Sequence, residues 1–203
     1  DRMATFQDTF ERNLNRNNPR FHGAYPTASA WKNSDYALTY NSFRKAFANV
    51  NGMHFTFVGK IEPKELQRLS ELYLGSLPSD ATQPPHFEDR GYRPDFTSRT
   101  VEVKKGKDPL SLVHIEFGGE TVYEPKENMA MDAVGYIMTM RLLDQLREAQ
   151  GGVYSVGAAG QIIKQPYGRY TFSIDFPCEP AKADALTQSA LKELKQFIAS
   201  GPT

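Results

Sequence analysis

A double glycine separates two residues that could together hold a peptide backbone. Arg147 lies near the end of a predicted long helix, and Tyr154 follows seven positions later, after Gly151 and Gly152. A helix that ends at glycine and continues as a strand can bring a guanidinium and a phenol to one corner. Both groups donate hydrogen bonds suited to a peptide carbonyl or a developing oxyanion. An ordinary role is also open, because an arginine near a helix C-terminus complements the helix dipole and strand tyrosines commonly pack.

Metal-ligating side chains form no known zinc peptidase motif in this sequence. The patterns H-E-x-x-H and H-x-x-E-H are both absent, and the four histidines lie at positions 22, 54, 86 and 114. His114 and Glu116 share one face of a predicted strand, so both could point at a metal. Zinc needs three or four convergent ligands, and we find no third one. We therefore interpret His114 as a strand histidine that is hydrogen-bonded to a neighbour.

The single cysteine and a pair of glycines have ordinary structural interpretations. Cys178 has no second cysteine to bond within the chain. It lies between a predicted strand and a predicted helix, where a thiol can be activated, but a small buried residue is the more common role. Gly157 and Gly160 lie within a predicted strand pair and indicate a bulge or close backbone packing. The sequence contains no nucleophile elbow, P-loop or dinucleotide-binding fingerprint.

The overall composition excludes several classes of protein. Lysine plus arginine number 24 and aspartate plus glutamate also number 24, so the formal net charge is zero. A nucleic-acid binder or a polybasic membrane anchor would show a basic excess. Hydrophobic residues make up 39% of the 203 residues and aromatic residues 12%, which is typical of a globular core. No apolar run approaches the roughly 18 residues that a membrane span needs, so we expect neither nucleic-acid binding nor membrane insertion.

Hydrophobic periodicity and turn residues predict the elements that must position these side chains. The predicted helices span residues 1–17, 34–48, 62–74, 125–149 and 180–199, with a packed loop over 19–34. The predicted strands span residues 54–58, 100–104, 110–117, 153–163 and 167–176. The inward-facing residues include Leu38, Phe43, Phe47, Met131, Val134, Met138, Leu142, Leu146, Tyr170, Phe172, Ile174, Phe176, Leu186, Ala190, Leu194 and Phe197. A mostly antiparallel sheet covered by helices on one face fits this order best, which is an α+β two-layer sandwich.

The chain divides into a leading segment and a main domain. Residues 1–34 form the leading segment, a helix and loop that enter from a preceding domain, and residues 35–203 form the main domain. The last four residues, Ser-Gly-Pro-Thr, are typical of a turn that leads onward. We therefore expect the main domain to be truncated at its C-terminus and the chain to come from a longer protein.

Three stretches resemble the pitrilysin/insulysin family of zinc peptidases, the inverzincins. The stretch LREAQGGVYSVGA (146–158) is similar to a signature of the form L-R-E-x-x-G-x-x-Y-S-V in the second half of these enzymes. Residues 43–78 are similar to the family's passage of strand, glycine and helix that ends in LGSLP. The stretch IDFPCEPAKADAL (174–186) resembles the strand-to-helix passage of bacterial envelope members. Together these stretches relate residues 35–203 to one domain of such an enzyme.

The resemblance implies a clamshell of two similar halves, each built from two α+β domains. It implies that the N-terminal half binds zinc, whereas the C-terminal half has no metal site and closes over the substrate. It also implies that Arg147 and Tyr154 reach across to the catalytic site and hold the substrate backbone. Because the zinc motif is absent here, we expect a substrate-clamping, non-catalytic domain with no cofactor and no catalytic residue of its own, inactive by itself.

The resemblance also predicts the context in which this domain acts. We expect a parent that is a zinc-dependent metalloendopeptidase, with the zinc bound by a different domain. The expected partners are a peptide or unfolded polypeptide substrate and the zinc-bearing half, in the same chain or in a partner subunit. The similarity to bacterial envelope members predicts a periplasmic or cell-envelope location.

Three alternatives stay open at the level of sequence. The chain could be the second domain of the first half, which has the same fold and no chemistry. The parent could be a non-enzymatic scaffold, like the core subunits of respiratory complexes that resemble these peptidases. The domain could also be a stand-alone peptide-binding module that uses an open sheet edge. The retained Arg147 and Tyr154 favour the C-terminal half of a peptidase.

Overall fold

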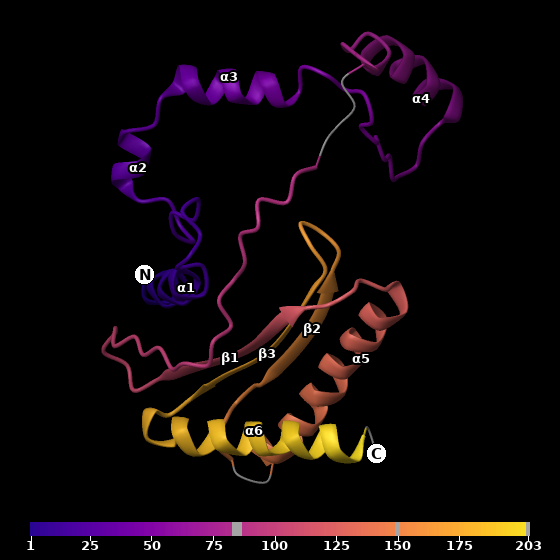
Figure 1. Ribbon diagram of the computed structural model, residues 1–203. Helices are drawn as coiled ribbons and strands as arrows, with labels where there is room; N and C mark the ends of the chain where they lie inside the picture. The colour runs from indigo at the N-terminus through magenta and orange to yellow at the C-terminus, as the bar shows by residue number, and fades with distance from the viewer. Residues whose placement is uncertain (83–86, 149–150, 202–203) are drawn as a thin grey trace. The chain divides into compact units, whose positions relative to one another are not determined.

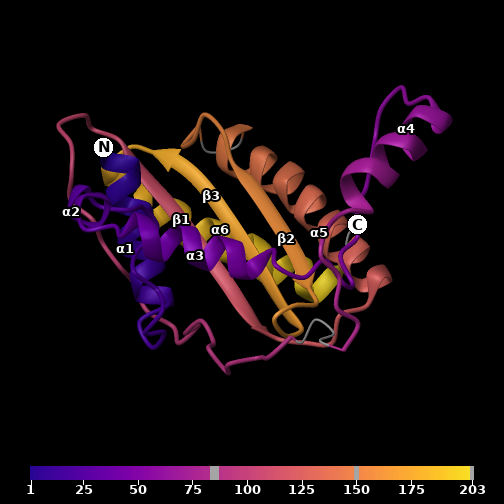
Figure 2. The ribbon, with the colours of Figure 1, turned by 90° about the horizontal axis from the view of Figure 1, so that it is seen from above.

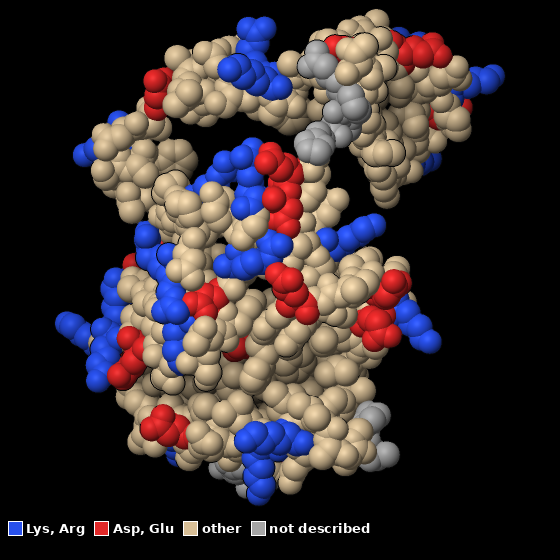
Figure 3. Space-filling model, viewed as in Figure 1, with Lys and Arg blue, Asp and Glu red and all other residues tan. Residues whose placement is uncertain are grey.

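The computed structural model describes residues 1–82, 87–148 and 151–201, and the chain forms two compact units. Unit 1 comprises Asp1–Ala24 and Gly91–Thr203, and unit 2 comprises Tyr25–Arg90. The buried hydrophobic residues of the described ranges all belong to unit 1. No helix in these ranges is both long and apolar enough to cross a membrane. Acidic and basic side chains are intermingled on the face drawn in Figure 3.

Unit 1 is built on a sheet in which strands from two parts of the chain lie side by side (Figures 1 and 2). The described residues form β1 (Ser111–Glu120), β2 (Gly157–Ile163) and β3 (Arg169–Cys178), in the order β1-β3-β2. Both neighbouring pairs are antiparallel. β3 alternates between buried and half-buried residues from Phe172 to Cys178, because successive side chains of a strand point to opposite faces.

Two helices cover one face of this sheet, which we call the inner face (Figure 1). α5 (Pro125–Leu142) continues as a π-helical segment, η2 (Leu143–Glu148). The short 3-10 helix η3 (Pro180–Lys182) leads into α6 (Ala183–Ser200). The core between sheet and helices comprises Met138, Leu142, Leu146, Val153, Val156, Phe172, Ile174, Phe176, Cys178, Leu186 and Ala190.

The core confirms the predicted inward faces of the C-terminal elements. Met138, Leu142, Leu146, Ile174 and Phe176 are completely buried. The other predicted core residues that pack against them are Met131, Val134, Leu194 and Phe197. The fold class is also confirmed, because a mostly antiparallel sheet is covered by helices.

α1 (Arg2–Leu14) lies on the opposite face of the sheet, which we call the outer face (Figure 1). The ring of Phe10 meets the imidazole of His114 edge-on, with 4.5 Å between ring centroids. The helix is also held by the chain that precedes β1. The guanidinium of Arg99 donates to the carbonyl of Asn13 at 2.7 Å, and Nζ of Lys105 donates to the hydroxyl of Thr5 at 2.6 Å.

Unit 2 is helical and is held by local hydrogen bonds. Its helices are α2 (Ala28–Lys32), α3 (Tyr36–Ala46) and α4 (Pro63–Leu69), and α4 continues as η1 (Ser70–Leu74). The carboxylate of Asp35 caps α3 by accepting from the backbone N–H of Leu38 at 2.9 Å. The side chain of Asn49 accepts from the backbone N–H of Asp80 at 2.9 Å and joins the segment after α3 to the segment after η1.

Five local predictions are wrong. Residues 54–58 and 100–104 have a strand-like pattern, but neither range is assigned as a strand in the described structure. A strand needs a neighbour to satisfy its backbone groups, and the pattern alone supplies none. β2 starts at residue 157 instead of 153, and α2 occupies part of the predicted loop. The predicted inward residues of α3 are exposed, namely Leu38 at 67%, Phe43 at 59% and Phe47 at 55%.

Candidate functional site

Tyr154 is a solvent-exposed aromatic residue on a segment that is anchored at both sides. Its exposed fraction is 87%, whereas Val153 and Val156 are each 7% exposed and belong to the core. Val153 also forms an isolated antiparallel bridge with Cys178 at the end of β3. The buried valines restrict the backbone on both sides of Tyr154, so its phenol is presented to solvent from a constrained support.

The double glycine makes the turn that separates Tyr154 from Arg147. Gly151 has a φ of 56°, a left-handed value that glycine adopts without steric cost. Its backbone N–H donates to the carbonyl of Arg147 at 2.8 Å, and the N–H of Gly152 donates to the carbonyl of Leu146 at 2.9 Å. These bonds fold the chain back onto the last turn of η2. Arg147 therefore lies at one end of this turn, and Tyr154 follows its other end, Gly152, by two residues.

The π-helical segment η2 determines which residues near this turn are buried. Leu146 is completely buried, and the next residue, Arg147, has an exposed side chain. Single π-helical turns within or after α-helices occur frequently at functional sites. Here the turn carries an arginine to the surface directly beside a core leucine.

The side chains of Arg147 and Tyr154 can bind a ligand through hydrogen bonds. A guanidinium offers several N–H donors, and a phenol offers one O–H donor that can also accept. Such groups can hold a peptide carbonyl or stabilise negative charge on an oxygen.

The edge of β2 near this corner is closed by α5. Asn128 accepts from the backbone N–H of Ile162 at 2.7 Å, and the hydroxyl of Thr139 accepts from the N–H of Ala158 at 2.8 Å. Between them lies Gly135, where a Cβ atom would be 3.1 Å from the backbone nitrogen of Gly160. A helix that covers a sheet edge prevents another strand from pairing there. A peptide added to this sheet as a strand would therefore have to pair along β1.

His114 lies between two carboxylates on the outer face. Its Nδ1 is 2.5 Å from Oδ1 of Asp175, and its Nε2 is 3.1 Å from Oε2 of Glu116. Burial alone would lower the pKa of His114, but the two hydrogen bonds and the two negative charges outweigh burial and raise this pKa to about 9. Both ring nitrogens then donate, as in the imidazolium form.

This cluster confirms that His114 is hydrogen-bonded to its neighbours, and the described residues do not fit a zinc site. In the described ranges no three His, Cys, Asp or Glu side chains form a group that could hold a metal ion. The third member, Asp175, was not found from the sequence, because only the register of β1 and β3 places it opposite His114.

Two further residues have the structural roles that the sequence predicts. Cys178 is buried, with 4% exposure, and burial raises the pKa of its thiol, which disfavours the reactive thiolate. Gly160 allows close packing, because a Cβ atom there would lie 2.8 Å from Met131 and 2.9 Å from Phe172. Gly135 also allows close packing, against the backbone of β2. The sequence did not predict this role, because a single glycine within a helix does not indicate which segment packs against it.

Unit 1 is therefore a two-layer α+β arrangement that carries an exposed arginine and an exposed tyrosine on either side of a double glycine. The model of the peptidase M16 inactive domain matches residues 40–203. The chain belongs to this family, which confirms the predicted relationship to the pitrilysin/insulysin enzymes.

Two curated relatives are described as probable zinc proteases. The chain is 24% identical over 163 residues to the probable zinc protease PqqL of Haemophilus influenzae, which covers 79% of this chain and 17% of that protein. It is also 24% identical over 160 residues to the probable zinc protease PqqL of Escherichia coli. This match covers 78% of this chain and 17% of that protein. The chain therefore spans about a sixth of the length of these relatives.

Two solved structures share the fold. The periplasmic protease PqqL from Escherichia coli superposes with a TM-score of 0.57 and 25% identity, over 71% of this chain and 16% of that one. The ferredoxin protease FusC in complex with Arabidopsis ferredoxin superposes with a TM-score of 0.72 and 14% identity, over 98% of this chain and 21% of that one. The second similarity concerns the fold alone.

Proposed function

We propose that this chain is the substrate-clamping, non-catalytic domain of a zinc-dependent metalloendopeptidase that cleaves peptides or unfolded polypeptides. The observation that carries the proposal is the pair of exposed side chains, Arg147 and Tyr154, on either side of the double glycine, with Tyr154 87% exposed on a segment anchored in the core. Aromatic residues are favoured anchors for binding, so a tyrosine on a constrained support is suited to contact a substrate. The two side chains would donate hydrogen bonds to the backbone of the substrate.

The zinc of the parent protein would be bound by a different domain, in the same chain or in a partner subunit. This part of the proposal is supported by the description of both curated relatives as probable zinc proteases and by the absence of a zinc peptidase motif from this sequence. The role of this chain in the reaction is to bind and orient. A well-oriented substrate lowers the barrier by removing the cost of positioning it during the reaction.

The substrate class follows from what the two donors can recognise. Peptide carbonyls recur in every polypeptide, so a clamp that reads the backbone accepts many sequences. The complex of the fold relative FusC with ferredoxin shows that protein binding a polypeptide partner. The proposed location is the periplasm or cell envelope, as for the relative PqqL of Escherichia coli. We also retain the proposed division into a leading segment, 1–34, and a domain, 35–203.

The test is the turnover of a quenched fluorescent peptide by the full-length protein with zinc. Tyr154→Phe removes only the hydroxyl, and we expect kcat/KM to fall on the order of 100-fold, as for the loss of one oxyanion donor. Arg147→Ala should have a comparable effect. Tyr136→Phe, another exposed tyrosine at 71%, is the matched control and should leave turnover unchanged.

Three results would contradict the proposal. Unchanged turnover in Tyr154→Phe would exclude the clamp role, and a full-length protein that does not hydrolyse peptides would favour a non-enzymatic scaffold. Robust hydrolysis by this chain alone would show that its own residues, and not another domain, perform the chemistry.

A further inference from the structure

The segment that carries Tyr154 rests on a helix far away in the sequence. At Gly152 a Cβ atom would lie 2.5 Å from Cδ2 of Leu186, 3.1 Å from its Cδ1 and 3.2 Å from its Cγ. Leu186 belongs to α6 and is only 2% exposed. A leucine at the surface could turn aside, but this one is part of the close-packed core and has little space to move.

The remaining contacts leave few ways for this segment to rearrange. The bond from Gly152 to the carbonyl of Leu146 fixes one end, and the buried Val153 and Val156 fix the middle and the other end. Of residues 152–156, Tyr154 and Ser155 are the exposed ones. A displacement of Gly152 that also shifts its neighbour Val153 would therefore move Tyr154, two positions later.

We propose that Leu186 is a positioning residue whose contact with the bare Cα of Gly152 determines where residues 151–156 present Tyr154. This inference rests on the proposed clamp function and adds a residue that has no contact with substrate. Leu186 acts through the backbone, so it links the position of α6 to the position of the phenol. A misplacement of about 1 Å at such a group can reduce the rate on the order of 100-fold.

The experiment uses four variants of the full-length protein, which are Gly152→Ala, Leu186→Ala, the double variant and Gly157→Ala. Gly157 is the matched control, because a Cβ atom there would meet nothing within 4 Å. Two measurements are made on each variant. Hydrogen–deuterium exchange of residues 151–156 reports the conformation of the segment, and kcat and KM for a quenched fluorescent peptide report its use.

The proposal predicts a specific pattern across these variants. Gly152→Ala should speed up exchange in residues 151–156 and lower kcat/KM by about tenfold or more, whereas Gly157→Ala should change neither. In the double variant the smaller side chain at position 186 makes room for the new methyl group. Exchange and kcat/KM should therefore return to within about threefold of the wild type, although the melting temperature stays below it because a buried leucine has been truncated.

Recovery of function without recovery of stability separates positioning from a merely structural role. If Gly152→Ala leaves both the exchange and kcat/KM unchanged, or if the double variant stays as impaired as Gly152→Ala, the proposal is wrong. If Gly152→Ala does not fold, Leu186→Met replaces it, because this volume-conserving change moves the branch that meets Gly152 at little cost in stability. Unchanged exchange and kcat/KM in a folded Leu186→Met protein would also overturn the proposal.

The outcomes distinguish this inference from the proposed function. A parent without hydrolytic activity, or an unaffected Tyr154→Phe, contradicts the clamp, while the exchange data still decide whether Leu186 fixes the segment. An impaired Tyr154→Phe together with an unaffected Gly152→Ala contradicts the positioning role alone.

Discussion

The inner and outer faces of the sheet in unit 1 are built from alternating residues of the same strands, yet different forces hold them. On the inner face Phe172, Ile174 and Phe176 are at most 6% exposed and pack against α5 and α6. On the outer face Asp175 forms a charged cluster with His114 and Glu116 beneath α1. The inner face should therefore be insensitive to pH and salt, whereas the attachment of α1 should depend on charge.

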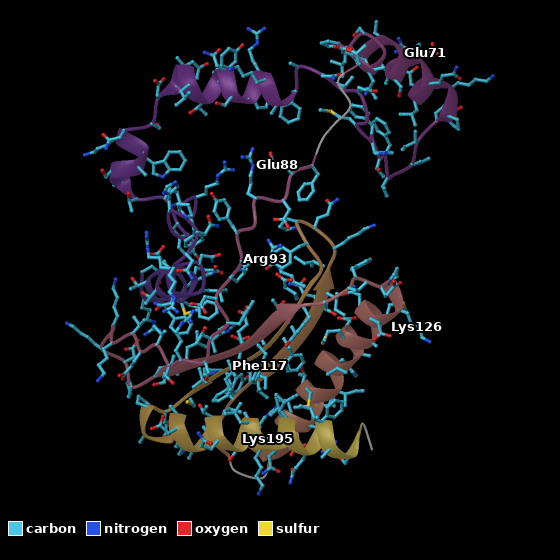
Figure 4. The ribbon with its side chains drawn as sticks, in the orientation of Figure 1. Glu71, Glu88, Arg93, Phe117, Lys126 and Lys195 are labelled. Atoms are coloured by element: carbon cyan, nitrogen blue, oxygen red, sulfur yellow. The ribbon has the colours of Figure 1, made fainter. Side chains whose placement is uncertain are left out.

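Charged residues also border the end of the sheet near the β2–β3 connection. Figure 4 shows Arg93 beside this end of unit 1, and its guanidinium lies 3.6 Å from the centre of the Tyr167 ring. Nε of Arg93 also donates to Glu120 at 2.7 Å. The guanidinium of Arg169 is 5.6 Å from the same ring, and its Nε is buried without a hydrogen-bond partner among the described residues. The polar contacts of unit 1 therefore extend beyond the area under α1.

The largest expected effect is the loss of a core side chain on the inner face. Phe176→Ala should lower the free energy of unfolding by about 3–5 kcal/mol, because it leaves a cavity where a completely buried ring had been. Urea denaturation followed by circular dichroism measures this change. Ser173→Ala, on the outer face of the same strand, is the control and should cost no more than about 1 kcal/mol. Equal costs would show that the two faces do not differ as described.

A smaller effect is expected from the ion pair between the two helices of the inner layer. Nε of Arg141 on α5 donates to Glu193 on α6 at 2.6 Å, and Glu193 is 8% exposed. Glu193→Ala should cost about 3 kcal/mol, because it leaves a poorly solvated guanidinium. Combining Glu193→Leu with Arg141→Met should recover most of this loss in the same denaturation experiment. A double variant that is as unstable as the single one would indicate that the charges themselves are required.

The outer face should lose stability as the pH rises. The pKa of His114 is raised to about 9 from 6.5, so its contribution is complete below pH 6.5 and is lost as the pH rises through 9. The groups that face it are Asp175, Glu116 and, from α1, Phe10 and Glu11. Burial and then Glu116 raise the pKa of Glu11, and deprotonating it with rising pH acts in the same direction.

His114→Gln should remove the part of this pH dependence between pH 6.5 and 9. At neutral pH the variant should be less stable by about 2 kcal/mol, a typical value for hydrogen bonds to charged groups. The measurement is the melting temperature at pH values between 6 and 9.5. Phe176→Ala is the comparison, because its melting temperature should fall with pH as steeply as that of the wild type. A slope that persists unchanged in His114→Gln would have to come from other groups.

The smallest effect is expected at the exposed end of α1. Arg2 and Asp108 form an ion pair at 2.5 Å, but their side chains are 46% and 69% exposed. Asp108→Asn should therefore change the free energy of unfolding by no more than about 1 kcal/mol, and 1 M salt should remove the difference. A larger effect that survives in salt would show that this end of the helix is held more tightly than its exposure suggests.

Hydrophobic spacing along the chain correctly predicted the elements that have a strongly apolar side. The spacing of Met138, Leu142 and Leu146 identified the buried side of α5 and η2, and the alternation in β3 identified the inner face. The same reasoning failed at residues 54–58 and 100–104, because β propensity describes a surface suited to pairing and does not supply the neighbouring strand. The residues Arg147 and Tyr154 were selected from type, spacing and family resemblance, and their role remains a proposal.

The sequence by itself determined the family, the α+β class, the absence of a zinc motif and most of the residues that form the inner core. These properties depend on residue order and on periodicity, which are local and can be read along the chain. Only the tertiary structure decided that Asp175 completes the cluster around His114, that α5 closes the edge of β2, and that Leu186 lies against Gly152. Each of these contacts joins residues distant in sequence through strand register or helix packing, which no local pattern specifies.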